Sequence, residues 1–151
     1  MARLLPPWAF DARGPRAAFL LRVVTGAIFV SEGLQKFLFA AELGAGRFAK
    51  IGIPMPDVMG PLVGVVEIAG GVLLVVGVAT RVVAIPLLVN MAVAITSTKL
   101  VTFAKNGFWK TAHEARTDLL MIACLVFLLA VGGGPWSLDG QRGGGGRGGR
   151  G

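Results

Sequence analysis

The sequence has one cysteine, Cys124, and one histidine, His113, and only 15% of its 151 residues are charged. One cysteine and one histidine exclude an intrachain disulfide, a dithiol redox pair and a bis-histidine haem within a single chain. No metal site and no intrinsic cofactor are therefore expected. Cys124 lies in an apolar segment and is interpreted as a core residue, as is Met121, whereas His113 lies among loop charges and is expected to be solvated.

Apolar residues are abundant instead. Hydrophobic residues make up 54% of the chain, and the mean hydropathy of +0.73 is too high for an ordinary soluble domain of this length. The net charge of +7 would suggest nucleic-acid binding in a soluble chain. In so apolar a chain, basic loops and tails beside a lipid surface explain the charge more simply. An integral membrane protein is expected, and nucleic-acid binding is not.

Four apolar segments are each close to the ~20 residues that a helix needs to cross a bilayer. They comprise residues 16–41, 58–78, 82–101 and 115–131. The turn near Thr80 and Arg81 is very short, so the second and third segments are expected to be antiparallel neighbours. Asn90 lies within the third segment and needs a hydrogen-bond partner there, so it should face the other helices. The predicted fold is an all-α, integral membrane four-helix bundle.

The remaining segments divide the chain into three parts. Residues 1–15 form a basic segment with aromatic anchors, residues 16–139 hold the four helices, and residues 140–151 form a Gly/Arg-rich tail that is expected to be disordered. Residues 42–57 are a polar connection with one short turn around Phe48, and residues 99–113 form a basic aromatic loop. Four spans place both termini on one side, and the distribution of charges slightly favours the cytoplasm.

Glycines recur on one face of the first two apolar helices. In the second helix, Gly60, Gly64 and Gly71 share a stripe with the acid Glu67. In the first helix, the corresponding stripe holds Arg22, Gly26, Phe29, Gly33 and Lys36. Small residues on one face of a membrane helix let a neighbouring backbone come close. The two stripes are therefore expected to face each other, with Glu67 pointing into the bundle.

Two polar clusters are candidate sites. At a rise of ~1.5 Å per residue, Arg22, Glu67 and Asn90 lie at similar depths, so contact between Arg22 and Glu67 is expected, directly or through Asn90 or water. An outer cluster lies nearer the far surface, with Lys36 expected to pair with acids of its own helix and of the last helix. It comprises Glu32, Lys36, Glu114 and Asp118.

Two interpretations stay open for each cluster. A buried ion pair can fix the register of the helices. Alternatively, the same groups can line a polar cavity that holds a headgroup, a quinone ring, a small anion or a proton path. No catalytic residue is assigned.

Four motifs occur in order along the chain: GLQK at 33–36, FAKIGIPMP at 48–56, VEIAGGVLLVVGVATR at 66–81 and GGGPWSLD at 132–139. Together they resemble the DoxX family of small four-helix bacterial membrane proteins, over residues 16–139. The motif positions that carry over are Arg22, Lys36, Glu67, Gly71, Arg81 and Asp139. Glu32 stands where many relatives carry a histidine.

The resemblance implies an inner-membrane bundle and, for some relatives, a part in thiosulfate to quinone oxidoreduction or in a complex that handles thiol and oxidative stress. The leading hypothesis is an accessory subunit of such a system that scaffolds partners or binds a quinone-like or lipid-like molecule beside Glu67. The expected partners are membrane lipids and either a redox complex or further copies of the chain. Two alternatives are a small transporter or proton-coupled carrier and a purely structural membrane anchor.

Overall fold

The computed structural model describes residues 7–10 and 14–144 of the chain. Its long helices are α1 (Ala18–Leu38), α3 (Pro56–Val76), α4 (Thr80–Ala94) and α5 (Leu100–Val131). The shorter ones are the 3-10 helix η1 (Pro7–Phe10), α2 (Ala45–Lys50), α6 (Leu138–Gly144) and a π-helical turn, η2 (Ile95–Lys99), which joins α4 to α5. No strand occurs in this part of the chain, and the predicted all-α fold is confirmed.

Three helical segments in the described ranges are long and apolar enough to cross a membrane. They are Ala18–Leu38, Pro56–Val76 and Thr80–Lys99, and they coincide with the first three predicted spans. The apolar part of α5 is short, because Glu114, Arg116 and Asp118 precede it. A fourth span within α5 therefore stays a prediction.

Helices α1 and α3 form an antiparallel pair in which the two backbones touch. A Cβ atom added to Gly26 would lie 2.6 Å from the carbonyl oxygen of Gly71, and one added to Gly33 would lie 2.7 Å from that of Gly64. Side chains cannot be accommodated at such distances, so glycine is required on both faces. The two predicted stripes do face each other. Gly60 lies one turn beyond this contact and packs against the start of α2.

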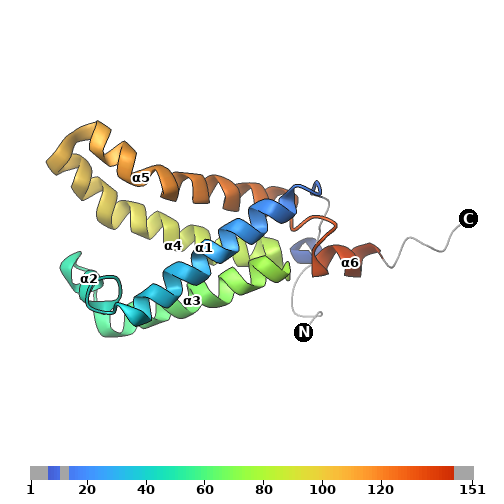
Figure 1. Ribbon diagram of the computed structural model, residues 1–151, viewed down its shortest axis with the longest axis horizontal. Coiled ribbons are helices and arrows are strands. Elements are labelled where there is room, and N and C mark those ends of the chain that lie inside the picture. The colour runs from blue at the N-terminus through green and yellow to red at the C-terminus, as the bar shows by residue number, and fades with distance from the viewer. Residues whose placement is uncertain (1–6, 11–13, 145–151) are drawn as a thin grey trace, which may run out of the picture.

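Helices α4 and α5 form the second pair. Figure 1 shows that the two pairs converge near α6 and diverge toward α2. The convergent end is filled by the apolar core, which includes Leu74, Ala84, Leu87, Leu125 and Leu128. The turn between α3 and α4 lies at this end, where Gly77 terminates α3 in a left-handed conformation with φ of 78°. Within the described part of the chain, the divergent end has no comparable core, and this leaves room for a pocket.

Some boundaries differ from the prediction. The basic aromatic segment 99–113, predicted to be a loop, is helical, and the chain turns at Gly107, whose φ is 79°. A single glycine that can adopt this conformation allows a bend without a loop. The short turn predicted around Phe48 is α2, with Phe48 buried. Helix α6 extends to Gly144, into the segment predicted to be disordered, while residues 1–6, 11–13 and 145–151 lie outside the described residues.

Replacing Gly26 by leucine should destabilise the protein, because the new side chain would collide with the backbone of α3. Overpacking of this kind costs about 1–3 kcal/mol or more. The matched control is Ala27→Leu, on the exposed side of the same turn of α1. Unfolding in detergent, followed by circular dichroism during a titration with sodium dodecyl sulfate, measures the difference. Equal loss of stability in both variants would show that the glycine contact does not hold the pair together.

Candidate functional site

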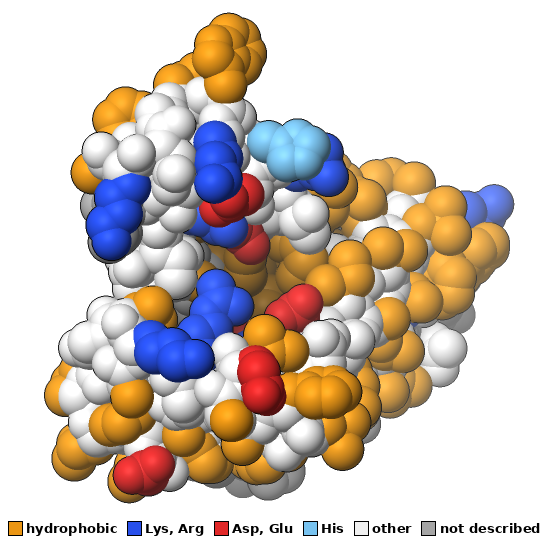
Figure 2. All heavy atoms as spheres, turned by 60° about the vertical axis from the view of Figure 1, so that its left-hand side comes forward, with side chains coloured by type: hydrophobic (Ala, Val, Ile, Leu, Met, Phe, Trp, Pro, Cys, Tyr) orange, Lys and Arg blue, Asp and Glu red, His pale blue; other side chains and the backbone are white. Residues whose placement is uncertain are grey.

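A pocket of about 940 Å³ lies between the two helix pairs at their divergent end. Its walls come from α1, α3, α4 and the start of the apolar part of α5, and α2 with its flanking residues covers one side. Most of the lining is apolar, including Ile28, Phe29, Phe48, Val66 and Met121. Figure 2 shows the hollow from its open end, with cationic and acidic side chains around the mouth. The pocket is thus mainly apolar, with ten polar or charged side chains among its lining residues.

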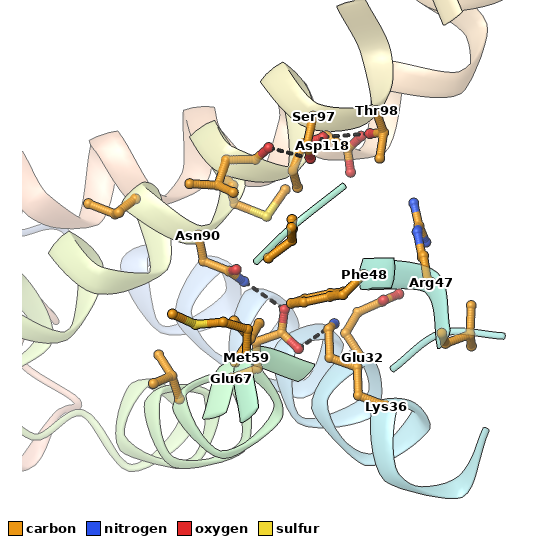
Figure 3. Close-up of a pocket in the computed structure, with 18 of the residues that line it drawn as sticks. Glu32, Lys36, Arg47, Phe48, Met59, Glu67, Asn90, Ser97, Thr98 and Asp118 are labelled. Atoms are coloured by element: carbon orange, nitrogen blue, oxygen red, sulfur yellow. Dashed lines mark hydrogen bonds and ion pairs between the residues drawn. The ribbon is translucent and has the colours of Figure 1, made fainter. Parts of the chain in front are cut away.

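Three polar side chains meet inside the pocket and are called the inner triad: Lys36, Glu67 and Asn90. Lys36 Nζ forms an ion pair of 2.6 Å with Glu67 Oε2, and Asn90 Nδ2 donates a hydrogen bond of 2.6 Å to Glu67 Oε1. Figure 3 shows both contacts converging on the Glu67 carboxylate from α1 and α4. Each oxygen of this buried carboxylate therefore has a donor, as burial of a charge requires.

The register of α1 on α3 explains why Lys36 reaches Glu67. Gly33 and Gly64 face each other at one level of the antiparallel pair. Lys36 and Glu67 each follow their glycine by three residues, so their Cα atoms lie on opposite sides of that level. Side chains on a helix lean toward its N-terminus. Because the two helices are antiparallel, Lys36 leans back toward Gly33 while Glu67 leans back toward Gly64. The two side chains therefore lean toward each other and meet.

The predicted contact between Arg22 and Glu67 is wrong. Arg22 is nearer the start of α1, and its side chain leans away from Glu67 for the same geometric reason. The buried guanidinium instead donates hydrogen bonds to two backbone carbonyls that follow α5, from Nη1 to Gly133 at 3.1 Å and from Nη2 to Trp136 at 2.9 Å. Similar depth along the helices does not predict this contact, because the direction in which each side chain leans also decides whether the two residues meet.

Arg22 belongs to a second polar group, here called the C-terminal clasp, together with Thr80 and Asp139. The buried Asp139 carboxylate accepts hydrogen bonds from the backbone N–H groups of Ala79 at 2.9 Å and Thr80 at 3.0 Å, and from the Thr80 hydroxyl at 3.3 Å. It thereby caps the N-terminus of α4 and holds Ala79 at the unusual φ of 47°. Arg81 donates to the Ala130 carbonyl at 2.9 Å. The motif positions Arg81 and Asp139 therefore join the ends of helices, away from the pocket.

The outer cluster is also rearranged. Lys36 is part of the inner triad, and its predicted pairing with Glu32 and Asp118 is wrong. Asp118 pairs with Lys99 at 3.5 Å, because α5 packs against α4. Glu32 lines the pocket without a hydrogen bond or ion pair to any described residue, whereas Glu114 is exposed and does not line it.

Two basic residues at the mouth were not predicted as site residues. Arg47 extends from α2 over the pocket (Figure 3), and Lys99 ends the π-helical turn, of which Ser97 and Thr98 also line the pocket. Such turns are frequent at functional sites. The sequence signal for Arg47 was weak, since only its neighbour Phe48 marked a segment that folds back onto the helices.

The other residues singled out by the sequence take separate positions. Met121 is buried and contributes to both the core and the pocket wall, and Cys124 is partly buried. His113 is exposed, with Nδ1 3.2 Å from Arg116 Nη1. Within the described residues, no three His, Cys, Asp or Glu side chains gather in a way that could hold a metal ion. The pocket therefore offers hydrogen-bonding and ionic groups in an apolar chamber.

Comparison with known proteins gives a family and several relatives. The DoxX family model matches residues 17–104. "Uncharacterized membrane protein Rv3486" of Mycobacterium tuberculosis is 46% identical over 142 residues, which are 89% of this chain and 87% of the relative. "Putative oxidoreductase CatD" of Bacillus subtilis is 34% identical over 120 residues, covering 80% of this chain and 82% of the relative. An "Uncharacterized protein" of Haemophilus influenzae is also 34% identical, covering 79% and 85%. No solved structure matches the chain.

The clasp and the pocket should respond differently to mutation. Asp139→Asn removes a charged acceptor from a buried cap, and hydrogen bonds to charged groups contribute about 1.5–3 kcal/mol each. We expect a clear loss of stability in detergent, measured by thermal unfolding. At a low temperature, at which the variant is still folded, any molecule that co-purifies with the wild-type protein should also co-purify with the variant. Glu42→Gln, at an exposed acid, is the control. If Asp139→Asn left stability unchanged, the clasp would not have the structural role assigned to it.

Proposed function

We propose that this chain, which belongs to the DoxX family of membrane proteins, binds an amphiphilic molecule from the membrane. The bound molecule is a quinone or a lipid, and the protein serves a membrane redox system. The observation that carries the proposal is the inner triad at the base of an apolar pocket. Binding sites for small molecules combine apolar walls with a few placed polar groups, in volumes of roughly 300–1,000 Å³. The pocket has this composition and size.

The hydrogen-bonding capacity of the triad supports a ligand with oxygen acceptors. The Lys36 ammonium has three N–H donors and the Asn90 amide has two, and each residue gives one of them to Glu67. Lys36 and Asn90 both line the pocket, and their remaining side-chain donors make no hydrogen bond to a described residue. A quinone ring fits this donor set, with Lys36 and Asn90 holding its carbonyl oxygens. When bound, a quinone would supply redox chemistry that these side chains lack.

The redox part of the proposal comes from a relative. CatD of Bacillus subtilis carries the name of a putative oxidoreductase, and the sequence here has one cysteine and one histidine. We therefore assign electron transfer to a partner protein and assign ligand binding to this chain. The contribution of Glu67 is to orient the Lys36 ammonium group through the ion pair.

The closed end of the structure favours this function over a carrier. The apolar core and the C-terminal clasp fill the convergent end, and the pocket lining extends along α4 toward that end only as far as Pro86, which lies between the core residues Ala84 and Leu87. A carrier needs access from both sides of the membrane, whereas a binding site needs one opening. Reconstitution of the purified protein alone into liposomes separates the two functions, since substrate or proton flux would favour the carrier.

Replacing Glu67 by glutamine should weaken retention of the ligand roughly tenfold, a difference of about 1.4 kcal/mol, because Lys36 then loses its counter-charge and its orientation. Protein purified in mild detergent is extracted, and the quinones and phospholipids released per mole of protein are measured by mass spectrometry. Glu32→Gln is the matched control, since Glu32 lines the same pocket without a hydrogen bond or ion pair to a described residue.

A lone Lys36 charge could also destabilise the fold, so the neutral double variant Lys36→Met with Glu67→Gln completes the set. It should be as stable as the wild type and should retain no ligand. Equal retention by the wild type, Glu67→Gln and the double variant would overturn the proposed function.

We also propose that α5 supplies a fourth span, which places both termini on the same side of the membrane. We propose that this membrane is the inner membrane of a bacterial cell and that the termini lie on its cytoplasmic side. After Gly107 the helix runs back alongside α4 and contributes Leu125 and Leu128 to the same core. An even number of spans places both ends on one side.

Fusion of a fluorescent protein after residue 151 should fluoresce, because such proteins mature in the cytoplasm, and an alkaline phosphatase fusion at Gly52 should be active. A fluorescent fusion at Gly52 together with an inactive phosphatase at the C-terminus would reverse the orientation. Activity of the phosphatase at both positions would remove the fourth span.

A further inference from the structure

We infer that the pocket opens sideways between α3 and α4, and that the apolar chain of the ligand leaves through this opening into the lipid while an uncharged carbonyl head stays at Lys36 and Asn90. The inference rests on the proposed function and deepens it, since it names the class of ligand and its route. The opening, here called the side portal, is bordered by Leu62 of α3 and by Val89 and Val93 of α4.

The side portal is identified by residues that line the pocket and are also exposed. Leu62, Val89 and Val93 all belong to the lining, and 50%, 59% and 47% of their surfaces, respectively, are exposed. Other lining residues, such as Phe29 and Met91, are buried. The exposed lining residues of α1, α2 and α5 are polar, namely Glu32, Arg47 and Thr117, whereas those of α3 and α4 are apolar. The pocket therefore has a closed wall toward the core and a loose apolar wall between α3 and α4.

The position of this wall places it in the membrane. Both α3 and α4 belong to segments that are long and apolar enough to span a bilayer. The side chains around the opening are a leucine and two valines, so lipid chains rather than water would meet them. A soluble ligand would gain nothing from such an exit, whereas an apolar chain passing through it stays in an apolar environment along its whole length.

The geometry of α4 connects the head site to the portal. Asn90 follows Val89 directly and lies one turn before Val93, which is a rise of about 5 Å on a helix. Asn90 and Val93 are three residues apart and so share one face. A head bonded to the free donors of Asn90 and Lys36 therefore has the start of its chain at the portal.

The charge balance of the triad indicates an uncharged head. The Lys36 charge is already compensated by Glu67 at 2.6 Å, so an anionic head would add an unbalanced charge within an apolar chamber. A carbonyl oxygen needs only the spare N–H donors. Membrane quinones combine this type of head with a long apolar chain.

Narrowing the portal tests the inference. In Val89→Trp, a large side chain occupies the opening, and Ile85→Trp is the matched control one turn earlier on α4, at a residue that is 43% exposed and does not line the pocket. Binding is measured in one detergent with three probes: a decyl-substituted benzoquinone, the same quinone ring without the chain, and decyl phosphate. Comparing variants with the same probe removes the contribution of the micelle.

The decyl quinone should bind Val89→Trp roughly tenfold more weakly than the wild type, while the ring without the chain should bind both within about twofold. Ile85→Trp should resemble the wild type with both quinones. Decyl phosphate should bind the wild type more weakly than the decyl quinone does, after each affinity is corrected for the partition of that probe into protein-free micelles.

The outcomes separate the route from the site. If the wild type binds both quinones but Val89→Trp and Ile85→Trp behave alike, the side portal is wrong and the proposed function stands. An equal loss of both quinones in Val89→Trp likewise contradicts the portal, because an effect on the route of the chain should weaken only the quinone that has a chain. Tighter binding of decyl phosphate would overturn the uncharged head. If the wild type binds neither quinone, both the inference and a quinone-binding function are lost.

Discussion

Backbone contact between α1 and α3 is the constraint on which the other features depend. Gly26 against Gly71 and Gly33 against Gly64 leave no room for a side chain on either helix. Two such contacts, two turns apart, fix both the register and the rotation of the pair. Once these are fixed, the lean of helical side chains directs Lys36 and Glu67 toward each other and directs Arg22 the opposite way. The positions of the inner triad and of Arg22 in the C-terminal clasp thus follow from one packing arrangement.

These two polar groups differ in what they can do. In the C-terminal clasp, Arg22 and Asp139 bond mainly to backbone groups and are buried at the end where the helices converge. Their role is to join helix ends that would otherwise carry unsatisfied N–H and C=O groups. In the inner triad, the charges pair with each other, and unused donors face a chamber. Burying such a pair is unfavourable compared with apolar packing, which is consistent with a role beyond stability.

Much of the architecture was predictable from the sequence, because glycine spacing, apolar length and turn length report on local geometry. The facing stripes, the first three spans and the inward position of Asn90 all have such local signals. The partner of Arg22 had none, since its acceptors are backbone carbonyls more than a hundred residues away. The predicted inward position of Glu67 is confirmed, but its predicted cation is wrong, because depth along a helix does not state which way a long side chain leans. The helical form of residues 100–113 was missed because a glycine bend and a loop have similar compositions.

The π-helical turn Ile95–Lys99 has a consequence for how this chain can vary. A π turn is equivalent to one extra residue within an α-helix, and each residue of an α-helix advances the face by about 100°. Deleting one residue here would restore a regular helix and rotate everything beyond it relative to α4. The pairing of Lys99 with Asp118 and the face of α5 that enters the core would both be lost. Length in this segment is therefore constrained more strictly than residue identity, and an insertion or deletion within it would be tolerated far less than a substitution.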